Sequence, residues 1–236
     1  MRRAFLVAAA CGLLMSAAAP AATIDPDNPS CPTQLNWSTY RQMKFTLEPV
    51  DGKRILKAEG MIDDGVAARL QDALKANAPI DEIWIRSPGG NARAGNEAGK
   101  VVRAAGIPTR IPNGWACFSA CNFLFMGGVV RYVDSNGLFI VHMFTFTSNR
   151  EAIRQATNSG ERGTVGLIGD IEQQSALLAS EDNNFLIRMG ISRNLLTEVM
   201  YRQSAVQDGQ NRSTRRCLTQ EEVNRYNVAT VPWRGR

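Results

Sequence analysis

The sequence predicts an α/β domain built on a parallel-rich sheet. Short apolar stretches alternate with helical stretches along most of the chain. This alternation is typical of strand–helix–strand units, in which the helix returns the chain so that successive strands lie parallel. The composition agrees, because 44% hydrophobic and 21% charged residues in a chain of 236 residues are typical of a globular protein. Disordered, collagen-like and coiled-coil classes are thereby excluded.

The first 21 residues have the pattern of a secretory signal peptide. Two arginines follow the initial methionine, residues 4–15 are apolar, and Ala19-Pro20-Ala21 has the small-residue spacing that signal peptidase accepts. A membrane-spanning helix needs about 20 apolar residues, so this run is too short for an anchor. We expect residues 1–21 to be removed, which leaves a periplasmic or secreted chain with no transmembrane segment in its mature part. The choice between general and twin-arginine export stays open.

Cysteine usage agrees with an oxidising compartment. An even number of cysteines follows the signal segment, and four cysteines allow three disulfide pairings. Cys117 and Cys121 can pair if a turn joins them, or they can be two small buried residues. A zinc site is disfavoured because the chain has one histidine and no Cys-x-x-Cys pair, so we expect no metal and no cofactor. The four cysteines are Cys31, Cys117, Cys121 and Cys217.

The charge of the chain gives no reason to expect a nucleic-acid partner. The formal net charge of +5 falls to +3 when the two arginines of the signal segment are removed. The densest basic spot, residues 212–216, carries no interleaved aromatic residues. A surface of mixed charge explains this composition better than a nucleic-acid interface does.

The first part of the chain predicts an arm, two strands and a helix. Clusters of Pro, Asn and Ser predict an irregular N-terminal arm over residues 22–44, so the α/β domain is expected over 45–236. Alternating residues predict strands over 45–62. Asp63-Asp64 supplies carboxylates that can cap a helix, which we expect to end near Pro79. The apolar stripe of that helix is Val66, Leu70 and Leu74.

The middle of the chain predicts alternating strands and helices. Residues 82–85 predict a short buried strand that ends in the turn Ser87-Pro88-Gly89-Gly90. A second helix is expected over 93–105. Residues 120–128 are almost entirely apolar and predict a third, buried helix. Residues 137–144 predict an apolar strand with the single histidine of the chain near its end.

The last part of the chain predicts a loop and further helices. Residues 145–169 are polar and rich in glycine, so we expect a flexible loop or insertion there. A long helix is expected over 170–189, with 191–201 continuing it. Thr219 and Glu222 have the spacing of a capping box before a short final helix.

Ser119 and His142 are the candidate catalytic residues. A serine hydroxyl is a weak nucleophile until a base takes its proton, and histidine is the usual base near neutral pH. Ser119 stands at the start of the buried helix, and His142 stands at the end of an apolar strand. The structural alternatives are a helix-capping serine and a hydrogen-bonded core histidine.

A second element of such a site is a pair of backbone amides. Glycine lets the backbone approach a ligand closely and can turn an N–H group outward. The N–H groups of Gly90 and Ala120 are therefore the candidate oxyanion hole.

The order of these features resembles the ClpP/crotonase superfamily, specifically its Clp-protease-like serine peptidases. Those proteins have a strand, a Ser-Pro-Gly-Gly turn, a helix, a Gly-x-Ala-x-Ser segment that opens a buried helix, and a strand that ends in His. The corresponding segments here are IWIRSPGG, GWACFSACNFLFMGGVVR and GLFIVHMF. The chain looks most like the exported branch, in which Cys-x-Ser-Ala-Cys surrounds the nucleophile.

The resemblance implies a fold of repeated β-β-α units and a role for each matched residue. Ser119 would be the nucleophile and His142 the base, with Gly90 and Ala120 as the oxyanion amides. A peptide or protein substrate would bind in extended form along the sheet edge. A disulfide between Cys117 and Cys121 would brace the turn that carries the nucleophile. A homo-oligomer and the identity of the substrate stay open.

The sequence departs from the family pattern in two places. One residue more than in Gly-x-Ala-x-Ser separates Gly114 from Ser119. The acid that completes a catalytic triad is not identified, because residues 183–207 contain no aspartate. Asp182 stands early and Asp208 late for this position, and the uncharged Asn194, Gln203 or Ser204 could orient the imidazole instead.

Two functions therefore compete. The first is an extracytoplasmic serine peptidase or acyl hydrolase that uses a Ser-His pair and a backbone oxyanion hole. The second is a catalytically silent relative that binds a peptide or protein partner. An acyl-CoA enzyme of the crotonase type conflicts with the signal peptide, because CoA is a cytoplasmic cofactor. The order of Ser119 and His142 favours the hydrolase.

Overall fold

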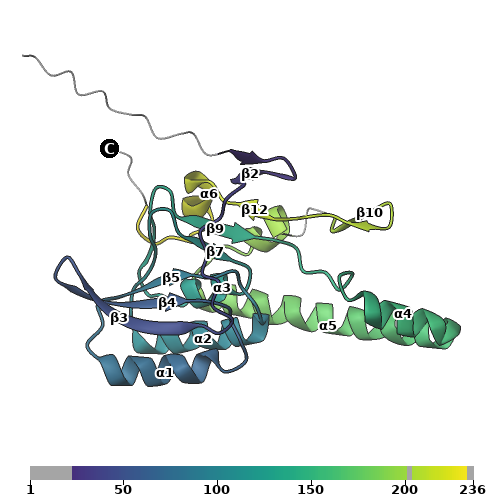
Figure 1. Ribbon diagram of the computed structural model, residues 1–236, viewed down its shortest axis with the longest axis horizontal. Coiled ribbons are helices and arrows are strands. Elements are labelled where there is room, and N and C mark those ends of the chain that lie inside the picture. Colours follow the sequence, from purple (N-terminus) through teal and green to yellow (C-terminus); the bar gives the residue numbers. More distant parts are fainter. Residues whose placement is uncertain (1–22, 201–203, 233–236) are drawn as a thin grey trace, which may run out of the picture.

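The computed structural model describes residues 23–200 and 204–232. The expected signal peptide, residues 1–21, and Gln203 lie outside the described residues. The described part is a mixed α/β protein with a parallel-rich main sheet, which confirms the predicted fold class (Figure 1). Strand pairs precede helices repeatedly along the chain, so the order of elements contains β-β-α units.

The main sheet has five strands in the order β3-β4-β5-β6-β8. β3 and β4 pair antiparallel, with Leu47 opposite Leu56, and every other neighbouring pair is parallel. The apolar residues Ile83 and Ile85 of the central strand are fully buried. The strands are β3 (Lys44–Val50), β4 (Lys53–Glu59), β5 (Glu82–Arg86), β6 (Thr109–Ile111) and β8 (Arg131–Val133).

A second sheet carries the segments that precede Ser119 and His142. Its order is β12-β9-β7, with β7 and β9 parallel and β12 antiparallel to β9. A bridge between Ser87 and Cys117 joins β7 to the turn after β5. This bridge sets the Ser-Pro-Gly-Gly turn beside β7. The strands are β7 (Ala116–Phe118), β9 (Leu138–Val141) and β12 (Arg216–Cys217).

Three helices pack around these sheets. α1 (Val66–Asn77) and α2 (Ala92–Ala105) lie along one face of the main sheet (Figure 1). Every residue of α3 (Cys121–Met126) is buried, as its apolar sequence predicts. Glycines let α2 approach the start of α3 closely, because a Cβ at Gly95 would lie only 2.4 Å from the carbonyl oxygen of Ala120.

The predicted cap of α1 is wrong. Gly65 precedes the helix, and no side chain caps it. The Asp63 carboxylate pairs with Arg69 and accepts the backbone N–H groups of Gly65 at 3.1 Å and Met43 at 3.3 Å, neither of which belongs to the first turn of α1. These hydrogen bonds hold the pKa of Asp63 below its usual value. An ion pair with a neighbouring guanidinium satisfies this carboxylate better than the first helical turn does.

The loop predicted over residues 145–169 is also wrong. α4 (Arg150–Asn158) and α5 (Gly160–Met189) fill this region, and together they extend out of the α/β body (Figure 1). Asn149 caps α4, because its side chain accepts the N–H of Ala152. Glycine lowers helix propensity by about 1 kcal/mol per residue, yet this region is helical and α4 lies in contact with α5.

The remaining elements lie at the two ends of the described chain. The segment predicted as an irregular arm contains one hairpin, and the later residues of that segment, 33–43, have no regular element. A π-helix follows α5, and the predicted capping box of Thr219 and Glu222 is confirmed before the last helix. These elements are β1 (Ile24–Asp25), β2 (Asn28–Pro32), η1 (Leu195–Met200), β10 (Val206–Gln207), β11 (Gln210–Asn211) and α6 (Gln220–Arg225).

Arg131 fastens the C-terminal segment to the core. Its side chain is 1% exposed, and its guanidinium donates to the carbonyl oxygens of Val228 at 2.7 Å, Asn227 at 2.8 Å and Gly128 at 3.0 Å. Burial lowers the pKa of Arg131 to about 10. Carbonyl dipoles thus take the place of a carboxylate partner for this buried cation.

We expect Arg131→Met to lower the free energy of unfolding by about 3 kcal/mol, because several buried carbonyls lose their donor. Chemical denaturation measures the difference. The control is Arg162→Met on the exposed face of α5, which we expect to change the unfolding free energy by less than about 0.5 kcal/mol. Equal stability of the two variants would contradict the role of Arg131.

Candidate active site

The structure brings Ser119 and His142 together. Ser119 Oγ lies 2.6 Å from His142 Nε2, which is hydrogen-bond distance. Ser119 follows β7 and His142 follows β9. Because these strands are parallel neighbours, their carboxyl ends meet at one edge and present both side chains there.

Ser119 occupies a strained turn. Its φ angle is 58°, in the left-handed region that residues with a side chain seldom adopt. Its N–H donates to the carbonyl oxygen of Ile140 at 3.2 Å, which fixes the turn to β9. Strain of this kind is stored at functional sites and persists where the surrounding structure enforces it.

A disulfide closes the turn. Cys117 and Cys121 are joined, with their Cα atoms 5.4 Å apart, so a covalent bridge spans the residues on either side of Ser119. Cys31 and Cys217 form the second disulfide and tie β2 to β12. Of the three pairings that four cysteines allow, the structure therefore has this one.

Two glycines let the Ser-Pro-Gly-Gly turn approach neighbouring backbone closely. Gly89 has a φ angle of 88°, and a Cβ there would lie 2.6 Å from the carbonyl oxygen of Phe118 and 2.8 Å from the Cβ of Ser119. At Gly90 a Cβ would lie 2.1 Å from the carbonyl oxygen of Ile62. Only glycine fits at either position, so Gly89 allows the close approach to Ser119 and Gly90 the close approach to Ile62.

The candidate oxyanion amides lie beside the pair. Gly90 and Ala120 line the same cavity as Ser119 and His142. Within the described ranges, neither N–H donates a hydrogen bond to another protein group. Both amides thus retain a donor for an oxygen atom of a ligand.

His142 is held by aromatic packing in a partly buried position. Its ring centroid lies 4.8 Å from that of Phe118, which in turn stacks on Trp37 of the N-terminal segment. Burial lowers the pKa of His142, and the Met143 backbone opposes this shift. The lowered pKa favours neutral imidazole, which is the form that accepts a proton.

No acid partner of His142 is found among the described residues. Asn194 and Asp208 are exposed, and the Ser204 hydroxyl donates to the carbonyl oxygen of Val206 at 2.6 Å. No described carboxylate or side-chain amide forms a hydrogen bond with the histidine ring. The third position of a triad therefore stays unassigned.

A cavity of about 550 Å³ opens beside the pair. Most of its walls are apolar and come from α3, β9, α5 and η1. Asp182 of α5 also lines it, although its sequence position is early for a triad acid. The sequence contained a signal for this placement, because Leu178 and Leu186 lie four residues before and after Asp182 on one face of the helix.

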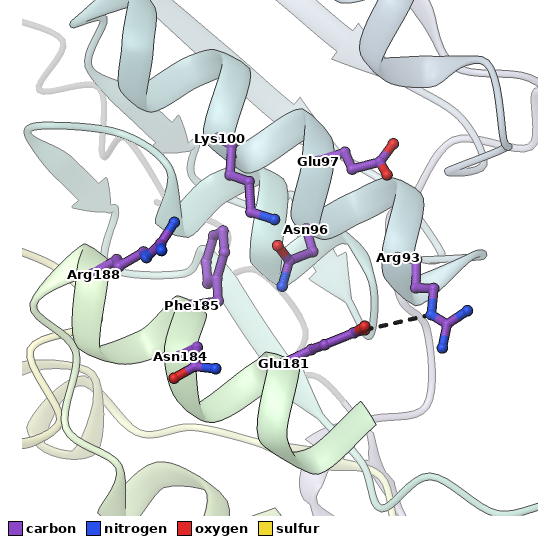
Figure 2. A pocket seen from close by; sticks show the side chains of 8 residues that line it. All are labelled: Arg93, Asn96, Glu97, Lys100, Glu181, Asn184, Phe185 and Arg188. Atoms are coloured by element: carbon purple, nitrogen blue, oxygen red, sulfur yellow. Dashed lines mark ion pairs between the residues drawn. The ribbon is translucent and has the colours of Figure 1, made fainter. Parts of the chain in front are cut away.

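A separate hollow of about 250 Å³ lies between α2 and α5. Figure 2 shows Arg93, Asn96 and Lys100 on α2 facing Glu181 and Phe185 on α5, with an ion pair of 3.4 Å between Arg93 and Glu181. Its lining has charges of both signs and none of the candidate catalytic groups. We therefore assign the candidate site to the larger cavity.

The described residues contain neither a metal-ligand cluster nor a membrane-spanning helix. No group of three or more His, Cys, Asp and Glu side chains is placed to hold a metal ion within residues 23–200 and 204–232. No helix in those same ranges combines the length and the apolar character needed to span a membrane.

Comparison with known proteins gives a distant structural likeness. No protein-family model matches the chain, and no curated protein matches its sequence. Among solved structures, the chain is similar to a ClpP1 mutant from Listeria monocytogenes, with a TM-score of 0.49 and 15% sequence identity. That similarity covers 77% of this chain and 92% of the other.

We expect Gly89→Ala to displace Ser119 and to slow its reaction with a fluorophosphonate probe about 100-fold, because a shift of about 1 Å has that effect on a positioned group. Gly166→Ala on α5 is the control, since a Cβ there meets no atom within 4 Å. Labelling rates follow from a gel time course. An unchanged rate in Gly89→Ala would show that the close approach does not position the hydroxyl.

Proposed function

We propose that the chain is a serine hydrolase, of the peptidase or acyl-hydrolase kind, that acts outside the cytoplasm. The observation that carries this proposal is the 2.6 Å distance between Ser119 Oγ and His142 Nε2. The strained backbone of Ser119 and the unpaired amides of Gly90 and Ala120 support it.

The chemistry follows from the positions of these groups. His142 Nε2 takes the hydroxyl proton while Ser119 Oγ attacks the carbonyl carbon of the substrate. The N–H groups of Gly90 and Ala120 stabilise the oxyanion that forms. The imidazolium then gives its proton to the leaving group, which leaves an acyl group on Ser119. A water molecule, deprotonated by His142, releases that acyl group and restores the hydroxyl.

The proposed location is the periplasm or the extracellular medium. Two disulfides and the signal pattern of residues 1–21 support it, because disulfides persist in oxidising compartments. The proposed substrate class is a peptide or protein, bound next to Gly90.

A fluorophosphonate probe tests the nucleophile. We expect it to label the wild-type protein and not Ser119→Ala, and to label His142→Ala about 1000-fold more slowly, because general-base catalysis contributes on that order. Ser148→Ala is a matched control, since Ser148 lines the same cavity and is not part of the pair. Equal labelling of wild type and Ser119→Ala would exclude Ser119 as the nucleophile.

One observation favours a second function. No described acid meets His142, and loss of the triad acid lowers kcat by about four orders of magnitude in a related arrangement. A silent relative would bind peptides without cleaving them. In that case the probe would label neither wild type nor Ser119→Ala, and peptide affinity would be the same in both.

The labelling rate is expected to depend on the ionisation of His142. Because burial lowers the pKa of His142, the rate should rise with pH and reach its plateau with a midpoint below about 6.5. The labelling rate is measured against pH on the Asp182→Asn variant, because Asp182 is the other titratable side chain of the cavity and would otherwise add its own ionisation to the profile. A midpoint above the ordinary histidine value would contradict the role of burial.

A further inference from the structure

Asp182 places a carboxyl group on the wall of the cavity beside Ser119. The residue is 6% exposed. It shares one face of α5 with Leu178 and Leu186, and both leucines line the same cavity. The carboxyl therefore belongs to the face of α5 that covers the candidate site.

The Asp182 carboxyl has no partner within residues 23–200 and 204–232. It forms neither a hydrogen bond nor an ion pair there, whereas the adjacent Glu181 pairs with Arg93 in the separate hollow (Figure 2). Burial, together with the charge of Glu181, raises the pKa of Asp182 to about 7. Burying a carboxyl without a partner destabilises a fold, so an apolar residue would serve packing better at this position.

The rest of the cavity is suited to an alkyl chain. Among the described residues that line it there is no lysine and no arginine, and His142 is the other titratable group. An apolar cavity with one carboxyl complements a flexible hydrocarbon chain that ends in a cation. The apolar lining includes Phe123, Met126, Phe139, Leu178, Leu186 and Leu195.

Asp182 forms no hydrogen bond or ion pair with His142 within the described residues. The pKa of His142 responds to burial and to the Met143 backbone, and that of Asp182 responds to burial and to Glu181. Neither group shifts the pKa of the other. The two side chains line one cavity without forming a pair.

We propose that Asp182 makes this cavity a specificity pocket for a basic side chain, lysine or arginine, on the residue that precedes the scissile bond. The alkyl stem packs against the leucines of α5, and the ammonium or guanidinium group pairs with the carboxylate. The role of the pocket in choosing the scissile bond rests on the proposed hydrolase function. Binding of an alkyl cation in the cavity is independent of that function.

The first experiment measures binding without catalysis. Calorimetry at pH 8 compares n-pentylamine with 1-pentanol on Ser119→Ala protein. We expect the amine to bind at least about 10-fold more tightly, because a buried charge pair is worth more than about 1.4 kcal/mol. Adding Asp182→Asn should abolish this preference, and adding Glu181→Gln should keep it. Equal binding of amine and alcohol, or a preference that survives Asp182→Asn, overturns the proposal.

A second variant guards against a folding defect. Asp182→Leu removes the unpaired buried carboxyl, so we expect it to remain folded and to resist denaturant better than wild type. It should bind pentanol in preference to pentylamine. A folded Asp182→Leu protein that still prefers the amine overturns the proposal as well.

The third experiment measures specificity. Peptide esters that differ only in lysine or norleucine before the ester are compared by kcat/KM. Wild type should prefer lysine, and Asp182→Leu should prefer norleucine. The ratio of the two kcat/KM values should change by at least about 100-fold between the two proteins. Preference for norleucine in wild type overturns this proposal and leaves the hydrolase standing. Absence of both cleavage and probe labelling overturns the hydrolase, and the amine experiment then decides the pocket alone.

Discussion

The contact between the Ser119 hydroxyl and the His142 ring is the interaction on which the account depends. It exists because two short parallel strands, β7 and β9, end at the same edge of one small sheet. The left-handed backbone at Ser119 then turns its side chain toward the imidazole, 2.6 Å away. If the left-handed conformation at this position served packing alone, glycine would adopt it with less strain than serine does.

The surroundings of the pair limit how far it can move. A disulfide closes the turn around Ser119, and Gly89 allows the neighbouring turn to touch it. Phe118 packs on the imidazole ring. These constraints hold Ser119 and His142 in place, and within the described residues the amides of Gly90 and Ala120 have no protein acceptor. Preorganised donors of this kind stabilise developing charge without a further rearrangement.

Local sequence correctly predicted the elements whose structure is determined by their own residues. The buried helix α3 is apolar throughout, and the capping box at Thr219 satisfies its own backbone groups. Prediction from local sequence failed where contacts between distant residues determine the structure. Asp63 forms an ion pair with Arg69 and does not cap α1, and the glycine-bearing region after residue 149 forms α4 and the start of α5, which lie in contact with each other. The sequence showed Asp182 only as a residue too early for a triad acid, and its burial in the cavity wall follows from tertiary packing that the local sequence does not encode.

Trapping the acyl intermediate tests the central claim most directly. The protein is mixed with an activated ester, quenched in acid and digested, and mass spectrometry locates the added acyl group. We expect to find the acyl group on Ser119, and we expect its amount to fall sharply in His142→Ala. Acylation at other residues only, or the same amount on Ser119 with and without the imidazole, would contradict the account.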